Sequence, residues 1–466
     1  MELSTKKSIY ILIICCITVR MILFLLVGPW NADIVKNNIL QTHSDEMGYN
    51  NLAISLLHGN FSLYGNTEAL RTPLYPAFIG LFYFLFGKLI WIVLLAQIFV
   101  DSLSCLVLFL AIKELINPSV GFYSALFYVL NPFLMMRSVT LMSDTLFIFF
   151  CILFYYFFIK VFLLRSTKYV ILSALFLGLA TLTRPISIYL PLLIILFFVL
   201  IHKRDFKKAI KLSIFFCLVF LLSLSPWIIR NYLAFNEIFF STSGSYNLLM
   251  LYVVPMEVER RNQPTAVVEN ILKDEVDSLI ISKGLNPSNL NNYQKENYFK
   301  EIAINYIKKS PFTFVKYHVL GITHTIIGLG TREFATLLNI HTSQKIFNIQ
   351  GENNIFKLIA QFFKQKTIGE IVLGLFFGIY LFVGYLLLLI GVYSIKKYNH
   401  KSFLIFSLII AAYFLILTGA AGQARFRLPS IPFYICFVGI GFYNFTLILK
   451  NRKNISLKEN FKFLKS

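Results

Sequence analysis

The chain has 466 residues, of which 57% are hydrophobic and 14% charged, and its mean hydropathy is +0.71. This composition is typical of a helical protein that crosses a membrane many times, and it excludes an ordinary soluble domain. The formal net charge of +21 raises nucleic acid binding as an alternative, which the placement of the basic residues decides.

Apolar runs long enough to cross a bilayer core of about 30 Å recur along the chain. The first run follows Lys6 and Lys7, as in a signal peptide, but it is long and lacks a small-residue cleavage site, so we expect a retained anchor. The fold class is an all-α polytopic membrane protein with about 10–12 transmembrane helices. We predict ten spans, at residues 8–28, 89–112, 119–136, 145–164, 169–183, 186–201, 211–229, 369–394, 402–419 and 429–449.

The basic residues are distributed unequally between the two sides of this topology. If the N-terminus is cytoplasmic, the inner segments hold twenty of them: Lys6, Lys7, Lys113, Lys160, Arg165, Lys168, Lys203, Arg204, Lys207, Lys208, Lys211, Lys396, Lys397, Lys401, Lys450, Arg452, Lys453, Lys458, Lys462 and Lys465. The short outer segments hold only Lys36, Arg71, Lys88, Arg137, Arg184, Arg425 and Arg427. This asymmetry follows the positive-inside rule and predicts that both termini are cytoplasmic. The charge therefore reports orientation in a cell membrane and not nucleic acid binding.

Two stretches do not fit a simple count of spans. Residues 73–87, PLYPAFIGLFYFLFG, are short for a span and contain two prolines, so we expect a re-entrant or interfacial helix that lies against the bundle. Residues 231–368 are longer and more polar, and their apolar spacing predicts several amphipathic helices outside the membrane.

Two adjacent acids follow the first span, in HSDEMGYNNLAISLLHGN at residues 43–60. Thr42 could cap a helix here, with an acid that only complements the helix dipole, and this interpretation stays open. Glu46 is rotated by about 100° from Asp45, toward the polar side, and suits that structural role better. Asp45 instead begins an apolar helical face together with Tyr49, Leu52, Ala53, Leu56 and Leu57.

Five arginines stand at the ends of predicted spans on the outer side. Each alone could be an anchor that holds its charged head at the membrane interface. Arginine rather than lysine, repeatedly beside proline and aromatic residues, favours planar recognition of a phosphate group. The five are Arg71, Arg184, Arg230, Arg425 and Arg427.

Further charged residues lie in or beside the spans. Asp144, in TLMSDTLF, is placed on the same outer side, where Ser143 could alternatively make it an ordinary first-turn acid. Arg20 and Asp101 lie deep within two spans, where each costs at least about 2.5 kcal/mol, so we expect a structural ion pair. In the alternative interpretation, Arg20 contacts a bound phosphate, and Asp101 makes a hydrogen bond with a neighbouring polar group such as Gln97.

The order of several segments resembles bacterial glycosyltransferases of the GT-C superfamily. The resemblance is closest to the polyprenyl-phosphate-dependent branch, which includes protein mannosyltransferases, the aminoarabinose transferase acting on lipid A and lipopolysaccharide glycosyltransferases. The family usually has Glu at the position of Asp144, and residues 236–368 match no part of it. The segments are SDEMGYNNLA, RTPLYPAFIGLFYFLFG, NPFLMMRSVTLMSDTLF, GLATLTRP, PWIIRNYLAFNEIFFSTSGSYNL and ARFRLPSIPF.

The resemblance implies a GT-C fold and an inverting transfer of a sugar from a polyprenyl-phosphate donor to a lipid, glycan or protein acceptor outside the cytoplasm. The catalytic aspartate of the family falls on Asp45, a suitable general base for the acceptor hydroxyl. Glu46 and Asp144 are possible supporting acids. Tyr49 and Tyr75 are expected in the substrate pocket, and the five arginines would stabilise the leaving phosphate. No DxD or His/Asp cluster stands out, so we expect no cofactor and no metal ion.

The resemblance also divides the chain. We expect an N-terminal catalytic module at 1–235 that includes a first outer loop at 29–88, an extracytoplasmic region at 236–368, and C-terminal helices with a basic cytoplasmic tail at 369–466. A surface-polysaccharide polymerase or ligase is the closer alternative function, because it too would have a large outer loop with arginines. A lipid or glycan transporter needs charge along a path through the bilayer, and the spans contain little.

Overall fold

The computed structural model describes residues 4–40, 45–63, 65–341 and 366–463, and nearly all of its regular structure is helical. Within these residues, seven helical segments are long and apolar enough to cross a membrane. Their main helices are α1 (Thr5–Val27), α5 (Ile90–Leu115), α8 (Asp144–Leu164), α11 (Phe206–Phe235), α19 (Ile368–Tyr393), α20 (Lys401–Thr418) and α21 (Ile431–Phe463). The expected all-α polytopic fold class is therefore confirmed.

The remaining three predicted spans are shorter or broken. Residues 119–136 form α6 (Pro118–Val129) and α7 (Pro132–Ser138), which meet at an angle of 61°. Pro132 cannot continue the hydrogen bonding of α6, and the side chain of Asn131 accepts from the first amides of α7 instead. The helices α9 (Thr167–Thr183) and α10 (Leu190–Ile201) are apolar but shorter than a full span. The count of about 10–12 membrane helices stays a prediction.

A compact subdomain covers one end of the bundle, where α1 ends and α8 begins. It consists of α3 (Asp45–Leu57), a hairpin of β1 (Ser62–Leu63) and β2 (Asn66–Thr67), and α4 (Leu74–Phe86). Helix α4 packs against α3 and exposes large apolar side chains on its other face, which fits the predicted interfacial helix. Those exposed side chains are Leu81, Phe84, Leu85 and Phe86. We call this end of the bundle the site end.

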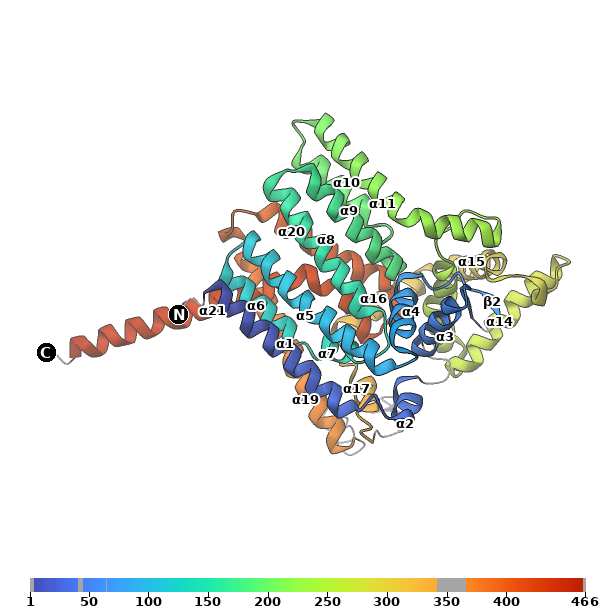
Figure 1. Cartoon of the computed structure of the whole chain (residues 1–466), viewed down its shortest axis with the longest axis horizontal. Coiled ribbons are helices and arrows are strands. Elements are labelled where there is room, and N and C mark those ends of the chain that lie inside the picture. Colours follow the sequence, from blue (N-terminus) through green and yellow to red (C-terminus); the bar gives the residue numbers. More distant parts are fainter. Residues whose placement is uncertain (1–3, 41–44, 64, 342–365, 464–466) are drawn as a thin grey trace.

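Up to residue 341, the long polar region folds into the amphipathic helices that its spacing predicts, whereas its residues 342–365 lie outside the described residues. Helices α13, α14 and α15 pack around a small apolar core of their own, which includes Val268, Leu272 and Val276. In Figure 1, α14 and α15 lie to the right of the bundle. The helices are α12 (Ser243–Asn247), α13 (Val254–Arg261), α14 (Thr265–Ser282), α15 (Asn292–Lys309), α16 (Pro311–Ile327) and α17 (Thr331–Leu337).

Candidate active site

The carboxylate of Asp45 lies between two arginines from distant parts of the chain. Arg71 Nη2 donates to Oδ1 over 3.1 Å, and Arg425 Nη1 donates to Oδ2 over 3.0 Å. Gly48, one turn along α3, makes room for Arg71, because a Cβ there would lie 2.8 Å from its Cζ. The Asp45 side chain remains 38% exposed, so its oxygens keep lone pairs that a substrate can reach.

These arginines set the protonation state of Asp45. Burial alone would raise the pKa of the carboxyl, but the positive charges of Arg425 and Arg71 outweigh it and hold the pKa below its ordinary value. Arg184 acts in the same direction from a greater distance. Asp45 is therefore ionised at neutral pH, as a general base must be.

A second carboxylate, Asp144, begins α8 and is 1% exposed. Arg184 Nη1 donates to its Oδ1, and Arg137 Nε lies 4.0 Å from its Oδ2. Asp144 is a first-turn acid with Ser143 at the N-cap position, as the alternative interpretation expects, but the Ser143 hydroxyl makes no capping hydrogen bond and lies 3.0 Å from the hydroxyl of Tyr49. That hydrogen bond joins α3 to the start of α8, and thus brings the Asp45 and Asp144 regions together.

The predicted pocket tyrosines and Glu46 lie in the same subdomain. The ring of Tyr49 packs edge-on against Tyr75, and Arg71 lies 5.6 Å from the centre of the Tyr49 ring. Tyr75 is fully buried and donates to Gln97 Oε1 over 2.5 Å, so it supports the wall behind Tyr49. Glu46 interacts electrostatically with Tyr75 and is half-buried. Thr42, the alternative cap for this helix, lies outside the described residues.

The structure does not place Arg230 and Arg427 beside Asp45. Arg230 donates from Nη1 to the carbonyl of Glu68 and from Nη2 to that of Phe61, so it secures the β-hairpin. Arg427 is buried, lies 3.8 Å from the centre of the Phe133 ring and donates to the last carbonyls of α16. Of the five predicted arginines, Arg71, Arg184 and Arg425 surround the two carboxylates.

Three residues that the sequence patterns did not single out complete the site. Glu68 is buried, accepts from the amides of Ala69 and Leu70, and lies 3.9 Å from Arg71. Arg137 pairs with Glu333, which lies 196 residues further along the chain. The sequence places Arg137 among the outer basic residues, whereas only the fold brings Glu333 to it.

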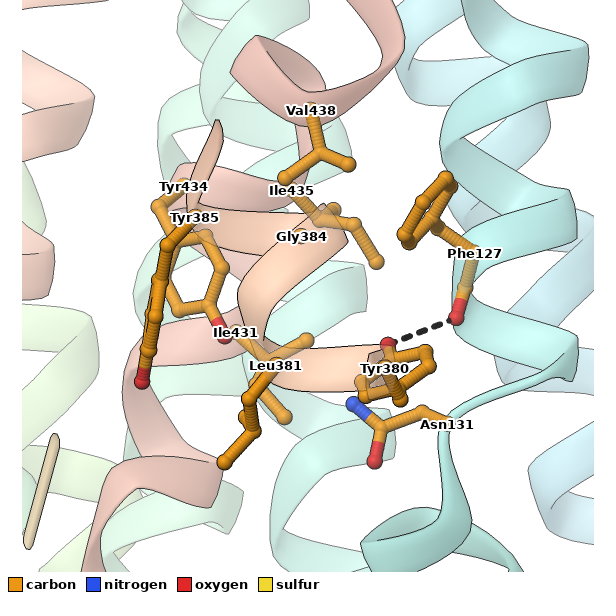
Figure 2. Close-up of a pocket in the computed structure, with 10 residues that line it drawn as sticks. All are labelled: Phe127, Asn131, Tyr380, Leu381, Gly384, Tyr385, Ile431, Tyr434, Ile435 and Val438. Carbon is orange, nitrogen blue, oxygen red and sulfur yellow. Dashed lines mark hydrogen bonds between the residues drawn. The ribbon is translucent and has the colours of Figure 1, made fainter. Parts of the chain in front are cut away.

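A separate small pocket lies between α6, α19 and α21 (Figure 2). Its lining is mostly apolar, and Tyr380 donates to the carbonyl of Phe127 over 2.9 Å at one side. It contains none of the site carboxylates. Among the described residues, no group of three or more His, Cys, Asp or Glu side chains lies close enough to hold a metal ion.

Comparisons with known proteins agree with this architecture. A sequence model of the dolichyl-phosphate-mannose-protein mannosyltransferase family matches residues 70–229, which include Arg71, Asp144 and Arg184. A comparison with curated proteins found no match. The structure is similar to that of the Archaeoglobus fulgidus oligosaccharyltransferase in the apo form, with a TM-score of 0.54 and 16% identity over 97% of this chain and 52% of that chain.

The Archaeoglobus fulgidus oligosaccharyltransferase tethered with an acceptor peptide containing the NVT sequon gives a TM-score of 0.52 and 16% identity over 94% of this chain and 49% of that one. The chain therefore spans about half the length of the oligosaccharyltransferase structures it matches. ArnT from Cupriavidus metallidurans bound to undecaprenyl phosphate gives a TM-score of 0.41 and 12% identity over 92% and 76% of the two chains. The GT-C fold and the expected resemblance to this superfamily are confirmed.

Proposed function

We propose that this chain, which has the GT-C fold, is an inverting membrane glycosyltransferase that takes a sugar from a polyprenyl-phosphate donor on the extracytoplasmic side. The acceptor would be a lipid, a glycan or a protein. One observation carries the proposal: a partly exposed carboxylate, Asp45, and a buried carboxylate, Asp144, are each paired with arginines in one group at one end of an apolar bundle.

The proposed reaction is a single displacement. The acceptor hydroxyl forms a bond to the anomeric carbon of the donor sugar while the bond from that carbon to the phosphate oxygen breaks. Asp45 takes the proton of the hydroxyl, and the bonding electrons leave with the phosphate. One base is sufficient, and attack from the opposite face inverts the anomeric configuration.

The arginines would stabilise the leaving group. As the bond breaks, a phosphate diester with one negative charge becomes a monoester with a charge of about −1.5 to −2. Guanidinium groups that are already held in place stabilise this added charge without reorganising. Arg184 and Arg425 occupy such positions, each fixed by a carboxylate.

Asp45→Asn tests the role of the base, since the amide keeps the size of the side chain but cannot accept the proton. We expect loss of transfer with normal accumulation of the protein. The envelope lipids and glycans of a deletion strain, complemented with each variant, would be compared by mass spectrometry. Glu46→Gln is the matched control and should retain most of the product. Full product from the Asn variant would exclude Asp45 as the base, and loss of a long polymer with its single units intact would favour a polymerase or ligase.

A further inference from the structure

The guanidinium group of Arg137, on α7, is buried, and one of its nitrogens has no hydrogen-bond partner among the described residues. Its side chain is 4% exposed and lies between two carboxylates from distant parts of the chain, Asp144 and Glu333. Among the described residues, Arg137 Nε and Asp144 Oδ2 have no hydrogen-bond partner, although they lie only 4.0 Å apart. Buried polar groups without a partner are rare, and each needs an explanation such as a functional role or a bound ion or water.

Glu333 is the accessible partner of this arginine. It lies on the short helix α17, its side chain is 48% exposed, and it accepts from Arg137 Nη2. The next residue, Phe334, packs on Phe377 of α19. Gly330 precedes α17 with φ of +60°, and a Cβ there would lie 3.2 Å from the Phe133 ring of α7. The loop backbone thus approaches α7 closely, while the Glu333 carboxylate reaches Arg137 from the solvent side.

The charges around the two site carboxylates balance only while Glu333 is in place. Four arginines (Arg71, Arg137, Arg184 and Arg425) face four acids (Asp45, Glu68, Asp144 and Glu333). Without Glu333 there would be a formal surplus of one positive charge. Arg137 would then have to share Asp144 with Arg184, so another anion would be favoured in the place of Glu333.

We propose that Arg137 is a further donor-phosphate-binding residue and that Glu333 is the carboxylate the phosphate displaces. This inference rests on the proposed function, because the phosphate is that of the polyprenyl-linked donor. A phosphate diester carries one negative charge, as a carboxylate does, and it also offers several acceptor oxygens. One of these oxygens would satisfy Arg137 Nε. Because the leaving phosphate gains negative charge, Arg137 would bind it more strongly as the sugar transfers.

The exchange predicts opposite effects for the two members of the pair. The assay measures binding of polyprenyl phosphate to the purified full-length chain in nanodiscs by native mass spectrometry. Arg137→Gln should weaken binding by about ten-fold or more, because a charge-assisted bidentate contact is lost. Glu333→Gln should strengthen it by about three- to five-fold, because a competing, partly exposed ion pair is removed. Arg137→Lys, which keeps the charge without the planar fork, should fall between Arg137→Gln and the wild type.

Two controls make the test specific. Glu301→Gln removes a carboxylate of similar exposure from an ion pair with Lys283 outside the site, and it should leave binding unchanged. In the Arg137→Gln background, Glu333→Gln should have no further effect, since its action passes through the arginine. Unchanged or weaker binding in the Glu333→Gln variant would overturn the displacement. A wild-type chain that binds no polyprenyl phosphate would overturn the proposed donor as well, whereas binding without any sugar transfer would leave the displacement intact and refute the proposed reaction.

Discussion

The guanidinium of Arg20 donates a hydrogen bond of 2.7 Å to the carboxylate of Asp101, and both side chains are buried in the bundle. Arg20 also donates to the carbonyls of Tyr128 and Val129 at the end of α6, while Tyr128 Oη donates to Asp101 over 2.5 Å. The predicted ion pair is therefore present in the structure. It joins α1 and α5 to the break between α6 and α7, and α7 carries Arg137 into the site.

We expect Arg20→Ala and Asp101→Ala each to lower the yield and thermal stability of the protein, because each leaves a buried charge unpaired, at a cost of about 3–5 kcal/mol. The double variant should lose less than the sum of the two, since neither charge remains. Size-exclusion chromatography after heating would measure this. Exchanging the two charges, with Arg20→Asp and Asp101→Arg, should recover little stability, because an aspartate at position 20 would face the α6 carbonyls. Additive losses in the double variant would contradict the pairing.

The pH dependence of transfer follows from the lowered pKa of Asp45. Because the pKa is depressed, the ionised base is present above the ordinary value of about 3.9 and is lost only as the pH falls through a still lower value. Initial rates should therefore show no acid limb from Asp45 between pH 5 and 8. Arg425→Gln removes the largest favourable charge, so its acid limb should move to higher pH. A wild-type limb near pH 6 would assign the base to another group.

Two of the predicted arginines can be distinguished by separate measurements. Arg184 pairs with Asp144, so Arg184→Gln should weaken binding of polyprenyl phosphate. Arg230 instead donates hydrogen bonds to two backbone carbonyls of the hairpin. Arg230→Gln should therefore lower the free energy of unfolding by about 1–3 kcal/mol and affect the binding of polyprenyl phosphate less. Binding and thermal unfolding would be measured on the same preparations. If both variants weakened the binding of polyprenyl phosphate equally, Arg230 would also be a phosphate-binding residue.

The parts of the site that the sequence predicts are those with a local pattern. Asp45 begins a helical face, and Asp144, Arg184 and Arg425 each stand at the end of an apolar run. The boundaries of the predicted spans are therefore sufficient to predict that all four residues lie on the same side of the membrane. Which arginine reaches which partner depends on packing between distant helices. Arg230 and Arg427 have the same sequence signature as Arg184, yet both bond backbone carbonyls. Glu333 lies on the short helix α17 of the long polar region, and no local feature of the sequence indicates its contact with Arg137.

Transfer is expected to continue when divalent metal ions are removed. Asp45 and Asp144 already have arginine partners, and these guanidinium groups can stabilise the leaving phosphate in place of a metal ion. Membranes containing the enzyme would be treated with EDTA, washed and assayed for transfer, and at least half of the activity should remain. Complete loss that is restored by one added metal ion would show that the arginines are not sufficient.

The last prediction concerns orientation in the membrane. The distribution of lysine and arginine predicts that the site end lies outside the cytoplasm and that the loop between α10 and α11 lies inside it. Asn60 lies exposed beside the hairpin at the site end, and Arg204 lies exposed in that loop, and neither belongs to the site. With the six native cysteines replaced by Ala or Ser, an impermeant maleimide should label Asn60→Cys in intact cells but Arg204→Cys only after lysis. Labelling of Arg204→Cys in intact cells, with Asn60→Cys protected, would invert the topology and place Asp45 in the cytoplasm, where a donor in the outer leaflet could not reach it.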